Sequence, residues 1–183
     1  MLSYNYSSKI LNGFFGRNVE DYRDAVGELI YKDTPIQMDE EGRHIYIGLF
    51  VEMPNYNGDG GKEPGYEKSQ GVWEVYPEYS RIQLDCRSRF DKKAEILSLA
   101  TSDGTTVSVT SQEMIIFPEA IGKDTDGWGD IAGFGLYYGK TSKDEESDLF
   151  LWGTIEDENG KPIKIAQYQV PVIRKGGLNI SLK

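Results

Sequence analysis

The chain has 183 residues, which suits one domain, and its 38% hydrophobic and 12% aromatic residues suffice for an apolar interior without disulfides or metals. Thirty acidic against twenty basic residues give a formal net charge of −10, and no basic stripe with interleaved aromatic residues occurs, which argues against nucleic-acid binding. No apolar run approaches the roughly 20 residues that span a bilayer, and no secretory signal pattern opens the chain. We therefore expect a soluble protein made in a cytoplasm, with neither nucleic acid nor membrane among its partners.

The helical signals of the chain lie at its front. A short apolar-periodic segment, Ser7–Phe15, precedes Asn18, which is a good N-cap for a second helix. The apolar residues that then fall on one helical face are Val19, Tyr22, Val26, Leu29 and Ile30. The sequence therefore predicts an N-terminal helical arm and insertion over residues 1–42, followed by a β domain over residues 43–183.

Beyond the arm, the apolar pattern changes to that of strands. His44–Val51 is a nearly continuous apolar run, which is typical of a strand covered on both faces. The turn Ser102–Gly104 joins two further runs and indicates a hairpin. The predicted strands are His44–Val51, Tyr79–Cys86, Glu95–Thr101, Thr105–Val109, Glu113–Phe117, Ile131–Tyr138, Leu149–Ile155, Gln167–Ile173 and Leu178–Leu182. About nine short strands separated by turn residues predict a mostly β chain, an antiparallel β-sandwich with a short N-terminal helical arm.

A long segment between the first two predicted strands is the clearest candidate for a contact surface. Pro54–Gly71 is rich in Gly, Asn and Asp and predicts a surface loop, and long loops in compact domains are often functional. Aromatic rings around such a loop can anchor a protein interface or stack on a sugar, although packing at a sheet end is their more common role. The candidate contact residues for a protein partner or a glycan are Tyr56, Tyr66, Trp73 and Tyr76.

Few residues point to catalysis. His44, the one histidine, opens a strand without an acid or cysteine at ligand spacing, and no serine lies in a Gly-x-Ser-x-Gly elbow. Paired carboxylates could perform the acid–base chemistry of a glycoside hydrolase, but among 30 acidic residues such pairs occur by chance. We therefore expect a protein that is not an enzyme, with no catalytic residue and no cofactor.

One acidic segment is a candidate metal site. Asp124, Asp126 and Asp130 lie in Asp-Thr-Asp-Gly-Trp-Gly-Asp, and acids at the first and third positions resemble part of a calcium loop. An EF-hand loop would have glycine at its sixth position and glutamate at its twelfth, whereas here glycine is fourth and Gly135 is twelfth. A glycine-rich turn that leads into the next strand explains the segment better, and calcium binding stays the alternative.

The second half carries a recognisable series of motifs. Ile115–Ala120 (Ile-Ile-Phe-Pro-Glu-Ala) is followed by Trp128–Tyr137 (Trp-Gly-Asp-Ile-Ala-Gly-Phe-Gly-Leu-Tyr), then by Leu149–Gly153 and a final Gly177–Leu182. This order resembles a family of small phage virion proteins that are labelled tail-fibre-like. We expect its aromatic residues to fill the core of the sandwich: Trp128, Phe134, Tyr137 and Trp152.

The front of the chain is similar to the same family in shorter pieces. Leu11–Arg17 resembles the family's leading helix and Tyr46–Phe50 its first strand, while Gly58–Gly65 and Tyr79–Ile82 resemble its glycine-rich loop and following strand. The segments that depart from the family pattern are Val19–Gly42 and Gly65–Glu78.

The resemblance implies a structural protein of the bacteriophage virion. Such a protein would be a tail fibre, a head fibre or a capsid-decoration subunit, would act through contacts with other virion proteins, and would form a homo-oligomer. No catalytic residue is implied. The alternative functions are a module that binds a host surface glycan through the aromatic loop and, third, a glycan hydrolase.

Overall fold

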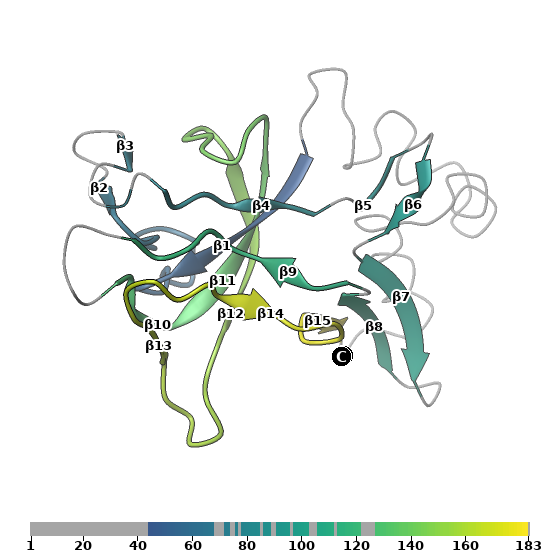
Figure 1. The fold of residues 1–183 in the computed structure, drawn as a ribbon. Coiled ribbons are helices and arrows are strands. Elements are labelled where there is room, and N and C mark those ends of the chain that lie inside the picture. Colours follow the sequence, from purple (N-terminus) through teal and green to yellow (C-terminus); the bar gives the residue numbers. More distant parts are fainter. Residues whose placement is uncertain are drawn as a thin grey trace. The chain divides into compact units, whose positions relative to one another are not determined.

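The structure is a computed structural model that describes residues 44–67, 72–73, 76, 78–84, 86–88, 91–95, 97–102, 106–111, 113–121 and 127–182 (Figure 1). These residues form strands and turns, and no helix occurs among them. The predicted helical arm over residues 1–42 lies outside the described residues. The chain divides into two compact units: unit 1 comprises Met1–His44, Leu84–Ile115 and Ile173–Lys183, and unit 2 comprises Ile45–Gln83 and Ile116–Val172.

Unit 2 contains a four-stranded sheet with the strand order β12-β11-β1-β4. Its strands are β1 (His44–Phe50), β4 (Ile82–Gln83), β11 (Gly133–Gly139) and β12 (Asp148–Thr154). β11 and β12 are antiparallel, and a shift in their register between Leu136 and Tyr137 marks a bulge. β1 and β4 are also antiparallel, with Ile47 opposite Ile82. Figure 1 shows β11 and β12 as the long green strands of this sheet.

The strand β1 is buried from Ile45 to Phe50, as its continuous apolar sequence predicts. Tyr46, Phe50 and Tyr137 form a core cluster, in which the ring centroids of Phe50 and Tyr137 lie 6.1 Å apart. The partly buried side chains that pack against this cluster are Met53, Leu149 and Trp152. Burying one such large apolar side chain contributes about 1.5–3 kcal/mol, so this cluster is a main source of stability for unit 2.

Two glycines let β11 approach this core. A Cβ atom at Gly135 would lie 2.8 Å both from the ring of Phe50 and from Leu149 Cδ1. A Cβ atom at Gly133 would collide with the sulfur of Met53. The Gly-Phe-Gly pattern of residues 133–135 therefore has a packing reason in this strand, because only glycine leaves room for the neighbouring side chains.

Two short antiparallel ladders complete the described strands of unit 2: β10 (Gly129–Ile131) with β13 (Ile163–Ile165), and β2 (Tyr66–Glu67) with β3 (Val72–Trp73). Trp128, just before β10, is buried edge-on against Tyr79 at 5.2 Å between ring centroids, and its indole N–H donates to Glu78 Oε1 at 3.1 Å. The predicted burial of Trp128 and Tyr137 is confirmed, whereas Phe134 and Trp152 are only half-buried.

Unit 1 contains a three-stranded antiparallel sheet with the order β15-β8-β7 and the pair β5-β6. The strands are β5 (Cys86–Ser88), β6 (Asp91–Glu95), β7 (Leu97–Ser102), β8 (Thr106–Ser111) and β15 (Asn179–Leu182). Ser102 pairs with Thr106 at the end of β7 and β8, which confirms the predicted hairpin. Two further strands, β9 (Ile115–Ile116) and β14 (Val172–Ile173), pair with each other. The boundary between the two units falls within each of these strands, after the first residue of each.

Several segments differ from the prediction. Among the described residues of the predicted strand Tyr79–Cys86, only Ile82–Gln83 and Cys86 are strand. Side-chain contacts rather than a ladder hold Tyr79 and Arg81. Within the predicted surface loop Pro54–Gly71, Glu63 is buried because it pairs with Arg81. Of the predicted strand Gln167–Ile173, only β14 remains, because a turn at Tyr168 interrupts it.

Candidate functional site

The loop that joins β1 to β4 contains all four predicted contact residues, and its two ends leave neighbouring strands of the same sheet. A loop of this length is uncommon in a compact domain and would be costly to order without contacts of its own. The contacts fall into three groups: a closed turn at the tip, a buried ion pair at the base, and the small β2–β3 ladder.

The tip is a turn organised by the side chain of Asn55. Its Oδ1 accepts the backbone N–H groups of Asn57 at 2.9 Å and of Asp59 at 3.0 Å, and its own N–H donates to the carbonyl of Asp59 at 2.8 Å. Gly58, at φ 85°, supplies the left-handed conformation that closes the turn. Tyr56 lies in this turn with 96% of its surface exposed. The turn thus holds a large aromatic side chain almost entirely in solvent.

Below the tip, the two arms of the loop pair with each other. Lys62 N–H donates to the carbonyl of Glu52 at 2.9 Å, and the carbonyl of Lys62 accepts the N–H of Val51 at 2.8 Å. The side chains of Glu52 and Lys62 also form an exposed ion pair at 2.7 Å. This pairing turns the next residue, Glu63, toward the protein interior.

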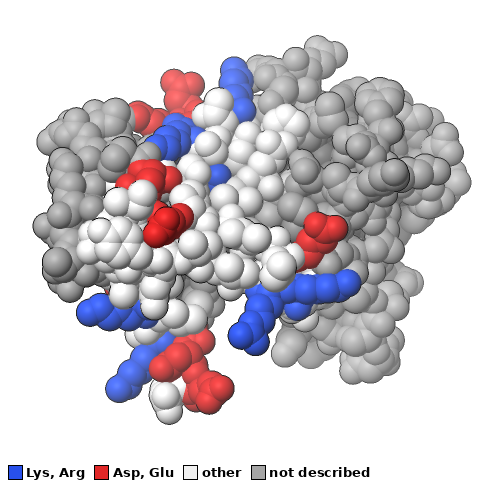
Figure 2. Space-filling view, viewed as in Figure 1, with Lys and Arg blue, Asp and Glu red and all other residues white. Residues whose placement is uncertain are grey.

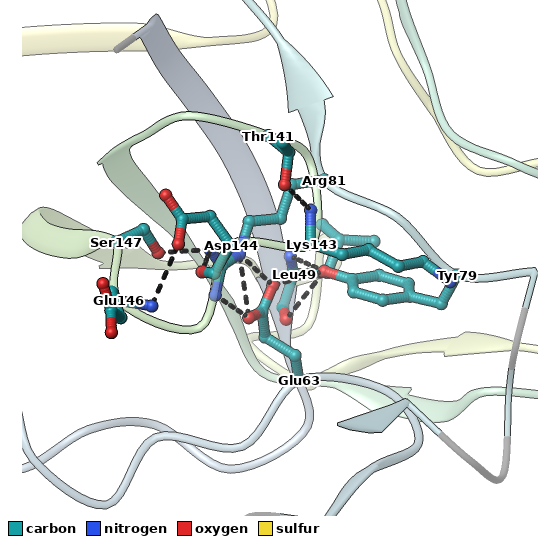
Figure 3. A network of polar contacts seen from close by, with 9 residues as sticks. All are labelled: Leu49, Glu63, Tyr79, Arg81, Thr141, Lys143, Asp144, Glu146 and Ser147. Atoms are coloured by element: carbon teal, nitrogen blue, oxygen red, sulfur yellow. Dashed lines mark hydrogen bonds and ion pairs between the residues drawn. The ribbon is translucent and has the colours of Figure 1, made fainter. Parts of the chain in front are cut away.

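The base of the loop is fixed by a buried ion pair between Glu63 and Arg81 (Figure 3). Arg81 Nη2 donates to Glu63 Oε2 at 2.6 Å, and Arg81 Nε lies 3.0 Å from Oε2 and 3.1 Å from Oε1. Both side chains are less than a tenth exposed. A fork of two parallel N–H···O contacts is the strong geometry for an arginine–carboxylate pair, and it holds Glu63 in one orientation.

Two tyrosines complete the surroundings of the pair. The hydroxyl of Tyr79 donates to Glu63 Oε1 at 2.8 Å and accepts the N–H of Leu49 in β1 at 2.8 Å. The ring of Tyr137 lies against the guanidinium, with Arg81 Cζ 3.6 Å from the ring centroid. Burial raises the pKa of both phenols well above their usual range, and the negative charge of Glu63 adds to the shift. Both tyrosines therefore stay neutral.

The same guanidinium also reaches the turn between β11 and β12. Arg81 Nη1 donates to the carbonyl of Asp144 at 3.0 Å and to the hydroxyl of Ser147. Burial alone would lower the pKa of Arg81, but the hydrogen bonds and charge of Glu63 outweigh it and raise the pKa. Arg81 thus stays charged and ties the loop, the sheet and a distant turn together, as Figure 3 shows.

Gly48 in β1 makes room for this arrangement. A Cβ atom there would overlap Glu63 Oε1 and would lie 3.2 Å from Arg81 Cγ. Glu63, Tyr79 and Arg81 are all buried, and Glu63 accepts hydrogen bonds from both of the others. The network anchors the loop to β1 and to the turn between β11 and β12.

The remaining contact candidates lie nearer the β4 end of the loop. Tyr66 and Trp73 are directly opposite each other in the β2–β3 ladder. Tyr76 is half-buried against Gly65, where a Cβ atom would lie 2.6 Å from the Tyr76 backbone nitrogen. The structure thus brings these three predicted residues into one neighbourhood and places Tyr56 on the separate turn at the tip.

Of the three residues of the predicted calcium site, the structure describes only Asp130. Asp124 and Asp126 lie outside the described residues, and Asp130 is exposed on β10 opposite Lys164 of β13. Among the residues that the structure describes, no three His, Cys, Asp or Glu side chains gather in a way that could hold a metal ion. In the same part of the chain, no helix has the length and apolar character needed to cross a membrane.

Sequence reasoning missed the ion pair. Glu63 is within a Gly-rich loop, where an acid is normally solvated, and Arg81 is within a predicted strand. One signal could have found Arg81: it follows Tyr79 at a spacing of two, so both side chains lie on the same side of an extended segment. If that side faces the core, the arginine needs a buried acid as partner.

Comparison with known proteins finds no family model that matches this chain, no match among curated proteins and none among solved structures.

Proposed function

We propose that the chain is a non-enzymatic structural subunit of a bacteriophage particle, a fibre or capsid-decoration protein that acts through protein–protein contacts. The observation that carries this proposal is the position of Tyr56, almost fully exposed at the tip of a loop whose base is fixed by a buried ion pair. Tyrosine is among the residues that most often anchor protein interfaces. A loop that is already ordered loses less conformational entropy when it binds.

The resemblance to phage virion proteins supports the same proposal. Two of the segments that carry it are Gly58–Gly65 and Tyr79–Ile82, and the Glu63–Arg81 pair joins one to the other. The resembling residues therefore include those that hold the loop in place. As finer parts of the proposal, the sheets pack as an antiparallel β-sandwich with an N-terminal helical arm, and copies of the chain assemble in the virion with other virion proteins.

Immunogold electron microscopy of purified particles from the encoding phage tests this function. Antibodies against the folded chain should label intact particles at a regular position, on the head for a decoration subunit or on the tail for a fibre. Label that is confined to unassembled material would contradict the proposal.

A second candidate function is the binding of a host surface glycan. The pairing of Tyr66 with Trp73 at opposite positions of the β2–β3 ladder favours it, because aromatic residues are the type that stacks on sugar rings. Titration of host surface glycans against the full chain, followed by NMR, separates the two functions. Shifts of the Trp73 indole signal that disappear in a Trp73→Ala variant would support glycan binding, and unchanged spectra at saturating glycan would exclude it.

A further inference from the structure

Two segments of unit 2 run side by side and expose several apolar side chains but only one charged residue, Glu119. Phe117 N–H donates to the carbonyl of Pro171 at 3.0 Å, Ala120 N–H to that of Gln169 at 2.8 Å, and Tyr168 N–H to that of Ala120 at 2.8 Å. We call these segments, residues 116–121 and 167–172, the apolar ribbon. Because backbone hydrogen bonds connect them at three points, the surface is formed before any partner binds.

The side chains of the ribbon divide into a buried and an exposed set. Phe117 and Ala120 belong to the core. The exposed apolar side chains, between 44% and 67% accessible, are Ile116, Ile121, Tyr168, Val170 and Val172. Monomeric proteins rarely expose contiguous apolar patches larger than a few hundred Å², and larger ones commonly mark interaction sites.

The backbone at Tyr168 supports a binding role for the ribbon. Among the residues that the structure describes, Tyr168 is the one non-glycine residue with positive φ, at 64°. A side chain in this region costs roughly 1–2 kcal/mol relative to the ordinary conformation, and strain of this kind concentrates at functional sites. Here the turn from Ala166 to Gln169 holds it, since the Gln169 side-chain oxygen accepts the N–H of Ala166 at 2.8 Å.

Charge indicates what covers the ribbon. Glu119 is the one charged residue in its two segments, although the chain as a whole carries a formal charge of −10. Figure 2 shows the surface over β9 and β14 without acidic or basic side chains, which lie at its borders. Two copies of an acidic chain repel each other, and this repulsion is weakest where faces with few charges meet. A two-fold contact places the same sparsely charged face on both sides.

We propose that the apolar ribbon is a two-fold contact between two copies of this chain. The copies meet through side chains rather than by joining strand edges, because Pro171 lacks the N–H that an added strand would need. Val170 and Val172 alternate along one segment and would present a common apolar face, and Tyr168 is exposed in the turn that precedes them. This contact would be the interface of the homo-oligomer that the proposed function includes. The inference rests on the proposed function only for the expectation that copies of the chain assemble.

Sedimentation velocity of the full chain, from about 1 μM to 1 mM, tests the contact over the range of weak and moderate affinities. The wild-type chain should form dimers, and Val170→Glu should raise the dissociation constant at least about tenfold, because two unpaired carboxylates would be desolvated across the axis. Ile163→Glu is the matched control: it places the same charge on an exposed apolar residue of β13, outside the ribbon, and should leave the dimer intact.

Tyr168→Gly is a second variant that suits the local backbone and removes the exposed ring. It should weaken the dimer without unfolding the chain. A wild-type chain that stays monomeric, a trimer, or equal effects of Val170→Glu and Ile163→Glu would overturn the two-fold contact. The proposed function is judged separately, because a monomeric chain that still labels phage particles would overturn the ribbon contact alone.

Discussion

Glu63 Oε2 and Arg81 Nη2 lie 2.6 Å apart in a buried ion pair, while Glu52 and Lys62 form an ion pair of nearly the same length, 2.7 Å, on the surface. The two pairs are adjacent in the loop, and burial distinguishes them. In the surface pair both side chains are more than half exposed, so water and salt screen their attraction. In the buried pair, removal of one partner leaves a desolvated charge without compensation.

Glu63→Gln should lower the free energy of unfolding by about 3–5 kcal/mol, because the buried guanidinium would lose its counter-charge. This is a large part of the total stability of roughly 5–15 kcal/mol that a domain has. Urea unfolding followed by tryptophan fluorescence measures it. Glu52→Gln is the control in the exposed pair and should cost less than about 1 kcal/mol. Equal losses in both variants would contradict the anchoring role of Glu63.

Gly48→Ala should destabilise the protein by about 1–3 kcal/mol, because the new methyl group would overlap Glu63 Oε1. The origin of the effect can be isolated in a double-mutant cycle with Glu63→Ala. In that background the carboxylate is absent, so the alanine at position 48 should cost clearly less. Additive effects would mean that the glycine is needed for another reason.

Alkaline pH should destabilise the protein through Tyr79 and Tyr137. Their pKa values are raised in the folded state by burial and by Glu63, so folding favours the protonated phenols. Their contribution is fully present below the unfolded pKa of about 10 and is lost as pH rises toward the folded pKa values, by up to about 1.4 kcal/mol per pH unit for each phenol. Stability curves at several pH values above 9 measure this slope. Tyr137→Phe keeps the ring on Arg81 and should remove one phenol's share; an unchanged slope would refute the assignment.

Tyr56→Ala should change the free energy of unfolding by less than about 0.5 kcal/mol, because the side chain is exposed and makes few contacts to lose. If Tyr56 anchors a virion contact, the same variant should be incorporated poorly into phage particles. The comparison of its stability in urea with its abundance in particles separates folding from binding. Normal incorporation would exclude Tyr56 as an anchor.

Tyr168→Gly should leave the free energy of unfolding unchanged or raise it by up to about 1 kcal/mol. Glycine adopts positive φ without strain, and this relief of strain offsets the larger backbone entropy that glycine loses on folding. The same substitution at an ordinary strand position would lower the free energy of unfolding instead. Thermal unfolding of dilute protein, below the concentration at which copies associate, measures the effect. A clear loss of stability would mean that the ring packs against the fold.

The sequence predicts those elements that depend on local pattern. The continuous apolar run at His44–Val51 corresponds to β1, and the predicted hairpin corresponds to the antiparallel pair β7 and β8. Short strands such as β10 and β13 were missed, because three residues carry too little periodic signal. The antiparallel, strand-rich character was predicted correctly.

The pairing of Glu63 with Arg81 could not be predicted, because it depends on a contact between distant residues, even though the spacing of Tyr79 and Arg81 hints that Arg81 is buried. Glu63 and Arg81 are 18 residues apart, and Arg81 also reaches Ser147, 66 residues further on. Nothing in the local pattern around Glu63 distinguishes it from a solvated acid. Tyr56 was named from the sequence as one of four contact candidates around a predicted surface loop, whereas its exposure at the tip of a turn comes from the structure.

Quantitative mass spectrometry of purified phage particles tests the proposed function most directly. The account predicts that the chain is present at a fixed ratio to the major capsid protein, high for a decoration subunit and low for a fibre. Absence of the chain from infectious particles would contradict a structural role in the virion.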